Sequence, residues 1–121
     1  MEFKKITLFF ISVSLLSACN INEDMRAKSA NKEDSYARTI AASNGCMGCH
    51  SVANKVVGPA WKKVAEHYKN SPDAKKLLVE KIKNGGKGNW NHETGGATMP
   101  AFDKKMTNED ITVVVDYILA L

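Results

Sequence analysis

The stretch Cys46-Met47-Gly48-Cys49-His50 decides the fold of this chain. Two cysteines separated by two residues, with a histidine directly after the second, form the attachment signature of a c-type haem. Each thiol can form a thioether with one vinyl group of the same porphyrin, which leaves His50 under the ring with an imidazole nitrogen directed at the iron. The motif therefore predicts one covalent haem c, attached through Cys46 and Cys49, with His50 as an axial ligand.

Other interpretations of the cysteine pair are weaker. A thioredoxin-like redox pair needs a βαβ pattern around it, and the sequence has no such pattern. A zinc site needs a second pair of ligands at short spacing. The only other cysteine is Cys19, which lies far upstream. The haem interpretation is therefore preferred.

The N-terminus has the pattern of an export signal. Two lysines precede an apolar run over residues 6–16, which is too short for a membrane-spanning helix of about 20 residues. The run ends in Leu16-Ser17-Ala18-Cys19, which resembles a bacterial lipobox, whose cysteine is acylated and becomes the first mature residue. We expect residues 1–18 to be a signal peptide and Cys19 to carry a lipid; the alternative is an ordinary secretory signal in which Cys19 is incidental.

Export agrees with the haem motif, because bacteria attach haem covalently outside the inner membrane. All three cysteines then have a use, so no disulfide is expected. The chain has a formal net charge of +4, but its only arginines, Arg26 and Arg38, form no cluster, so nucleic acid is not an expected partner. Lysines near a haem edge could instead steer an acidic redox partner.

Hydrophobic periodicity predicts one all-α domain over residues 33–121. Residues 19–32 are polar and are predicted to form a flexible tether. Four helices are expected, over residues 33–44, 60–70, 72–84 and 107–119. Residues 85–96 contain five of the eight glycines and are predicted to form a loop. About 87 residues bury only a small core, so we expect haem to complete it and the haem-free chain to fold poorly.

The second axial position separates an electron carrier from a catalyst. Candidate ligands in the sequence are several lysines and His67, His92, Met99 and Met106. His67 lies one position off an apolar helical face, and Met106 is most simply a core residue. Met99 precedes Pro100, which holds the chain extended, so a thioether there can approach the iron from the side opposite His50. On these grounds Met99 is favoured and His92 stays open.

Residues 35–121 resemble a class I bacterial cytochrome c of the short mono-haem c551/c552 (c8) type. Beyond the haem motif, the resemblance runs through residues 57–62, 82–85, 90, 98–100 and 116–119. It implies a class I cytochrome c fold of about four helices around one haem, with His50 and Met99 as axial ligands. It also implies that the Pro59 carbonyl accepts a hydrogen bond from His50 and that Trp90 lies near a haem propionate. One departure is the segment 91–97, which is longer than in the short carriers and contains His92.

The resemblance implies a one-electron carrier, not an enzyme, that works between membrane-associated or periplasmic redox enzymes. With Cys19 acylated, it would be bound by its lipid to the extracytoplasmic face of a bacterial membrane. Two alternatives remain. One is a haem-based ligand sensor or peroxidase-like protein with a labile sixth site, for which His92 is the only sequence feature. The other is an electron-transfer subunit of a larger oxidoreductase.

Overall fold

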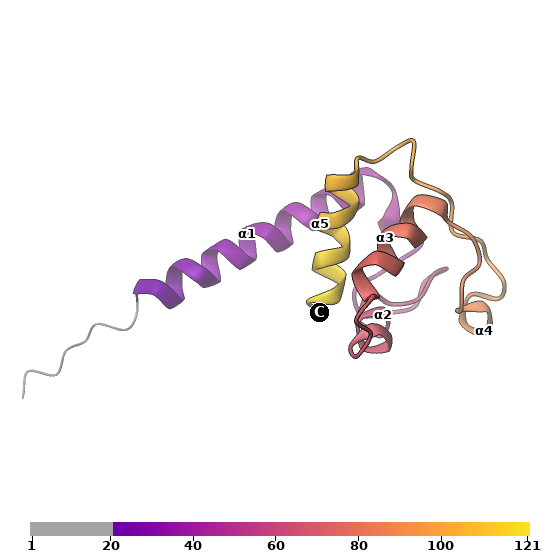
Figure 1. Cartoon of the computed structure of the whole chain (residues 1–121), viewed down its shortest axis with the longest axis horizontal. Coiled ribbons are helices and arrows are strands. Elements are labelled where there is room, and N and C mark those ends of the chain that lie inside the picture. The colour runs from indigo at the N-terminus through magenta and orange to yellow at the C-terminus, as the bar shows by residue number, and fades with distance from the viewer. Residues whose placement is uncertain (1–20) are drawn as a thin grey trace, which may run out of the picture.

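The computed structural model describes residues 21–121, so the predicted signal peptide, the lipobox and Cys19 lie outside the described residues. Apart from two isolated β-bridges, the regular structure in this range is helical, as predicted (Figure 1). The elements in chain order are α1 (Ile21–Ser43), the 3₁₀ turn η1 (Cys46–Gly48), α2 (Trp61–Tyr68), α3 (Ala74–Asn84), α4 (Asn91–Thr94) and α5 (Asn108–Leu119).

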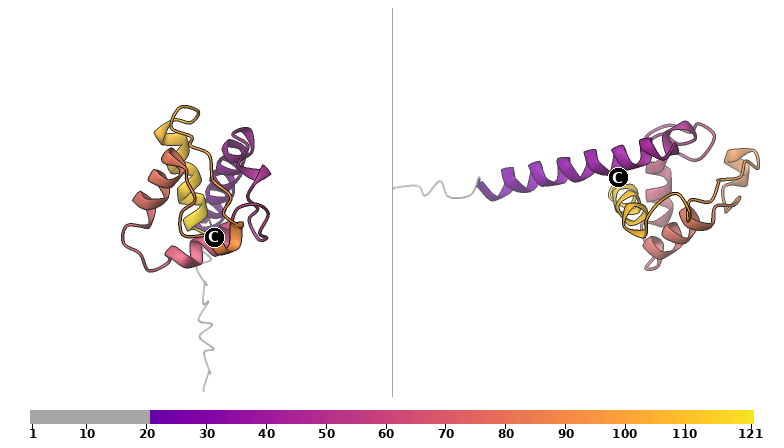
Figure 2. Two further views of the ribbon diagram at one scale, coloured as in Figure 1. Left: turned by 90° about the vertical axis from the view of Figure 1, so that its right-hand side faces the viewer. Right: turned by 90° about the horizontal axis from the view of Figure 1, so that it is seen from above.

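Helix α5 is the centre of the core. It packs against α1, α2 and α3, and Figure 2 shows it lying between α1 and α3. Its residues Ile111, Val114 and Val115 are the largest fully buried side chains of the described chain. The helix begins where the sequence predicted, because the Thr107 hydroxyl accepts a hydrogen bond from the backbone N–H of Asp110 at 3.1 Å.

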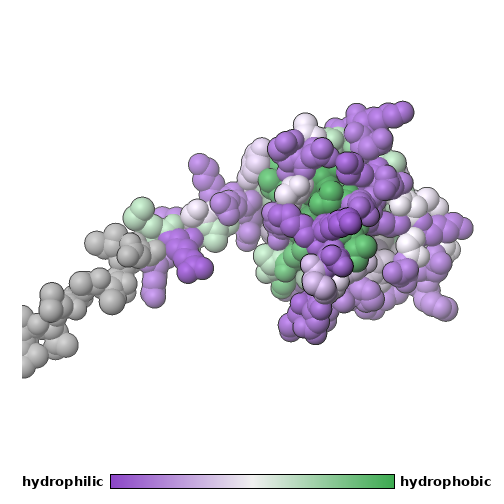
Figure 3. All heavy atoms as spheres, viewed as in Figure 1, coloured by the Kyte–Doolittle hydropathy of each residue, from purple (hydrophilic) through white to green (hydrophobic). Residues whose placement is uncertain are grey.

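Helix α1 corrects the prediction of a flexible tether for residues 21–32, which are the described part of the predicted tether 19–32. It begins at Ile21, and its first half projects from the domain (Figure 1). Side chains 23–36 are all exposed, and those visible along the projection are mostly hydrophilic (Figure 3). Among the helices of residues 21–121, none is both long and apolar enough to cross a bilayer.

The physical reason for this extended helix is local. The segment contains neither glycine nor proline, and Lys28 pairs with Asp24 one turn earlier at 3.2 Å. The last turns are fixed by the buried residues Ala37, Ile40 and Ala41, and a helix extends from such a nucleus at little cost. Tyr36, one turn before the buried Ile40, is 57% exposed.

The predicted loop over residues 85–96 contains the one-turn helix α4. Trp90 precedes the helix, and Gly95 ends it with a φ of 61°, a backbone conformation that glycine adopts without strain. The segment has no apolar period, which is why the sequence predicted only a loop. Its side chains are instead held by contacts with α2, through Glu93 and Trp90.

Candidate haem site

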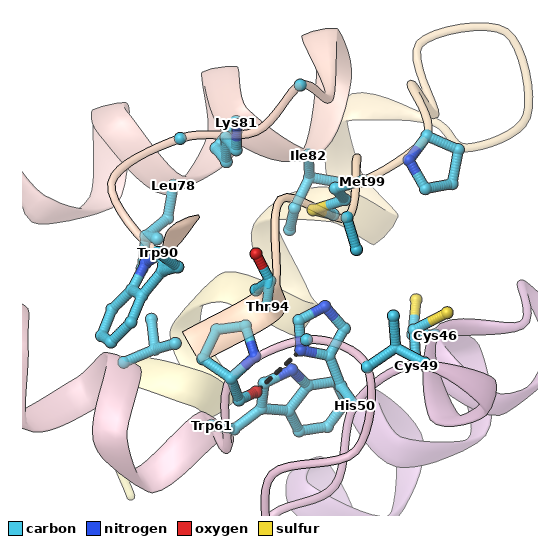
Figure 4. Close-up of a pocket in the computed structure, with 18 of the residues that line it drawn as sticks. Cys46, Cys49, His50, Trp61, Leu78, Lys81, Ile82, Trp90, Thr94 and Met99 are labelled. Atoms are coloured by element: carbon cyan, nitrogen blue, oxygen red, sulfur yellow. Dashed lines mark hydrogen bonds between the residues drawn. The ribbon is translucent and has the colours of Figure 1, made fainter. Parts of the chain in front are cut away.

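An apolar slot separates the cysteine motif from the segment that carries Met99. The cavity has a volume of about 320 Å³. Figure 4 shows His50 and Trp61 on one side of it and Met99 with Ile82 on the other. All the haem-site residues that the sequence suggested within residues 21–121 line this slot. They are Cys46, Cys49, His50, Pro59, Trp90 and Met99.

The cysteine motif follows directly after the end of α1. Gly45 has a φ of 79°, which ends the helical path and turns the backbone into η1. Within the turn, the N–H of His50 donates to the Cys46 carbonyl at 2.9 Å. Neither cysteine forms a disulfide, and their sulfur atoms lie at the same end of the slot (Figure 4). Burial raises the pKa of the Cys46 thiol, because desolvation disfavours the thiolate.

The imidazole of His50 is oriented by one hydrogen bond. Its Nδ1 lies 2.9 Å from the carbonyl oxygen of Pro59. Because a carbonyl can only accept, Nδ1 carries the proton, and Nε2 keeps a lone pair available for a metal. The ring also packs on the indole of Trp61, with centroids 6.1 Å apart and planes 26° apart.

Gly58 packs directly against the ring of His50. A Cβ at this position would lie 2.4 Å from Cε1 of His50 and 2.8 Å from Nδ1, closer than carbon and nitrogen atoms can approach without bonding. The position therefore needs a residue without a side chain. Sequence reasoning did not single out Gly58. Its contact with His50 forms only in the folded chain, and no local sequence pattern indicates it.

Met99 is fixed on the opposite side through its backbone. The N–H of Gly86 donates to the Met99 carbonyl at 2.8 Å, and the N–H of Met99 donates to the Gly86 carbonyl at 3.2 Å. Gly85 permits this approach, since a Cβ there would lie 2.4 Å from the Met99 carbonyl oxygen. The methionine is thereby fixed to the end of α3, and its thioether points into the slot (Figure 4).

The other histidine and methionine candidates lie outside the slot. Among the lysines, Lys81 and Lys87 line it, and the Lys81 ammonium donates a hydrogen bond to the Gly85 carbonyl at 2.9 Å. His92, in α4, is exposed and does not line the cavity. His67 packs against Trp90, with ring centroids 5.0 Å apart. Met106 is buried in the core, as predicted. No group of three or more His, Cys, Asp or Glu side chains in residues 21–121 could hold a bare metal ion.

Trp90 and α4 form the end wall of the slot, at the end away from the two cysteines (Figure 4). Trp90 is half-buried. The Thr94 hydroxyl lies in this wall and is buried without a hydrogen-bond partner among the described residues. Thr94 was not a candidate from the sequence, because it lies in a glycine-rich stretch that has no periodic pattern.

These residues fit a covalently bound haem. Two thiols lie at one end of an apolar slot, and an imidazole and a thioether enter it from opposite sides. Imidazole and thioether are the axial ligand types of cytochromes c.

Comparison with known proteins points in the same direction. The family model described as cytochrome c matches residues 35–121, which leaves the projecting half of α1 outside the match. Cytochrome c2 of Rhodocyclus tenuis is 38% identical over 82 residues, which are 68% of this chain and 88% of that protein. Cytochrome c-551 of Allochromatium vinosum is 40% identical over 82 residues, 68% of this chain and 82% of that protein.

Solved structures agree with the fold. The crystal structure of Nitrosomonas europaea cytochrome c552 matches with a TM-score of 0.61 and 38% identity, and covers 69% of this chain and 98% of its own. The class 1 cytochrome MtoD from Sideroxydans lithotrophicus matches with a TM-score of 0.58 and 31% identity, and covers 69% of this chain and 90% of its own.

Proposed function

Because this chain belongs to the cytochrome c family, we propose that His50 and Met99 are the axial ligands of its haem iron. The chain is a class I mono-haem cytochrome, an electron carrier with one covalent haem c. Cys46 and Cys49 are the attachment residues. The observation that carries the ligand assignment is the entry of the His50 imidazole and the Met99 thioether into the slot from opposite sides.

The bound haem supplies a one-electron Fe(III)/Fe(II) couple. The protein supplies the conditions under which that couple works. With an imidazole and a thioether on opposite sides, the ligands need little rearrangement when an electron arrives or leaves. The hydrogen bond from Nδ1 of His50 to Pro59 fixes the ring and makes Nε2 a stronger donor. Methionine ligation raises the reduction potential, and the apolar walls limit the access of water.

We also propose where the protein works and how it is attached to a membrane. The signal-like residues 1–18 and Cys19 support export and attachment to a membrane by a lipid. The electrons would then pass between membrane-associated or periplasmic redox enzymes on the extracytoplasmic side. Because α1 begins at Ile21, a helix rather than a coil would connect the lipid to the haem domain.

The alternative of a ligand sensor or peroxidase-like protein rested on His92. That side chain is exposed and does not line the slot, so no observation on the described residues favours this function.

Substitution of the two rival ligands tests the assignment. Met99→Ala should abolish the weak charge-transfer band of the methionine–Fe(III) bond, lower the reduction potential and admit carbon monoxide or cyanide to the iron. His92→Ala is the matched control and should change none of these. Optical spectra, potentiometric titration and ligand binding of the two holoproteins provide the measurement. If His92→Ala alone opens the iron, the Met99 assignment is wrong.

A further inference from the structure

Two side-chain contacts join the end wall of the slot to α2. The ammonium of Lys63 forms an ion pair with the carboxylate of Glu93. One turn further along α2, the ring of His67 lies 5.0 Å from the ring of Trp90, at an interplanar angle of 59°. Residues four apart on a helix share a face, so Lys63 and His67 present one continuous surface of α2 to the end wall.

The end wall cannot maintain its position by itself. Helix α4 has only four residues, and a single turn of helix is unfavourable in isolation because nucleation fixes many dihedrals for few hydrogen bonds. Gly95 and Gly96 follow it with positive φ angles of 61° and 81°, so the next residues do not extend the helix. The contacts with α2 therefore have to stabilise this turn.

The position of the end wall gives these contacts a consequence for the haem. Cys46 and Cys49 lie at the other end of the slot (Figure 4), and they attach to the vinyl-bearing edge of the porphyrin. The propionates lie on the opposite edge of the macrocycle. Trp90 and α4 consequently lie at the end of the slot where the propionate edge of a bound haem would be.

We propose that Lys63 and His67 are positioning residues that hold Trp90 and α4 against the propionate edge of the haem and so limit its hydration. The proposal rests on the proposed function only in requiring a haem in the slot; it does not depend on the sixth ligand. Less water around the ring disfavours the extra positive charge of the ferric state, so an intact end wall keeps the reduction potential high.

Opposite charges on the two partners allow a sharp test on the holoprotein. If the ion pair acts by holding the wall, Lys63→Gln and Glu93→Gln should both lower the midpoint potential. If the charges act only through space, the shifts should have opposite signs, because loss of the Lys63 cation favours ferric haem and loss of the Glu93 anion disfavours it. The charge swap Lys63→Glu with Glu93→Lys should restore the potential.

Hydrogen exchange provides the second readout. The Lys63 and Glu93 side chains are 59% and 27% exposed. Breaking such a partly screened pair should accelerate exchange of the α4 amides by up to about fivefold, which corresponds to roughly 1 kcal/mol. His67→Ala should accelerate the same amides, since it removes the packing partner of Trp90.

The control is an ion pair of similar type away from the slot. Lys75 on α3 pairs with Asp116 on α5 at 2.8 Å, and both side chains are 54% exposed. Lys75→Gln should leave both the potential and the α4 exchange unchanged. Shifts of opposite sign for the Lys63 and Glu93 variants, or α4 exchange equal to wild type, would overturn the proposal. Absence of the methionine–iron band in wild type would instead refute Met99 ligation, and the sign of the shifts would still test the end wall.

Discussion

Replacing Gly58 with alanine would place a carbon atom where the ring of His50 lies. The added Cβ would be 2.4 Å from Cε1 and 2.8 Å from Nε2 of that ring. Non-bonded heavy atoms are at their optimum at about 3.5 Å or more, so the ring has to move by about 1 Å. Gly58 is absent from the glycines with positive φ, so backbone strain adds nothing to this effect.

The cost of the substitution has two parts. Forcing an additional methyl group into a packed site costs about 1–3 kcal/mol. Moving the ring also breaks the 2.9 Å hydrogen bond to Pro59, which contributes about 1 kcal/mol. Each kcal/mol lowers Tm by about 4–8 °C in a domain of this size. The two costs together are about 2–4 kcal/mol, so we expect Gly58→Ala to lower the Tm of the holoprotein by about 8–30 °C.

The matched control is Gly48→Ala, in the same haem motif region. A Cβ at Gly48 has no atom within 4 Å, so this variant should resemble wild type. Thermal unfolding followed by circular dichroism, together with a potentiometric titration, compares the two holoproteins. If Gly58→Ala has the same Tm and midpoint potential as Gly48→Ala, the inference that Gly58 supports the His50 ring is incorrect.

Three other predictions concern attachment, stability and the anchor. Replacing both Cys46 and Cys49 with alanine should abolish covalent attachment of haem. Without haem the apolar side chains that line the slot lose their packing partner, so circular dichroism should show a largely unfolded chain. A helical, cooperatively folded variant would contradict this. Thr107→Ala should cost about 1 kcal/mol through loss of the hydroxyl that caps α5, with Tm lower by about 4–8 °C, whereas Thr107→Ser should stay close to wild type. Cys19→Ser should release the protein from membranes and remove the lipid from the N-terminal mass; a wild-type protein that is soluble and unmodified would rule the anchor out.

The helices that bury a face could be predicted from the sequence. In α2, Trp61, Val64 and Ala65 recur at helical spacing, and all three are buried. In α5, the same spacing of branched residues outweighs their preference for strands, and the Thr107 cap marks the first turn. The spacing works in these cases because burial against other helices is what stabilises them.

The other elements depend on tertiary contacts that the spacing of apolar residues does not indicate. Side chains 23–36 of α1 are all exposed, and their polar sequence contained no sign that the helix extends back to Ile21. Helix α4 and the preceding Trp90 contact Lys63 and His67, which lie more than twenty residues earlier in the chain. The haem-site residues themselves were proposed from a motif and a resemblance. That their side chains line one slot became visible only in three dimensions.

The paired hydrogen bonds between Gly86 and Met99 close the intervening segment into a loop whose ends are fixed. Lengthening a closed loop costs little, since doubling its length adds only about 0.6 kcal/mol of closure entropy. Residues can therefore be added or removed between positions 87 and 98 without displacing the backbone of Met99. This separation means that a change in loop length, which would alter the end wall formed by Trp90 and α4, leaves the backbone that presents Met99 in register.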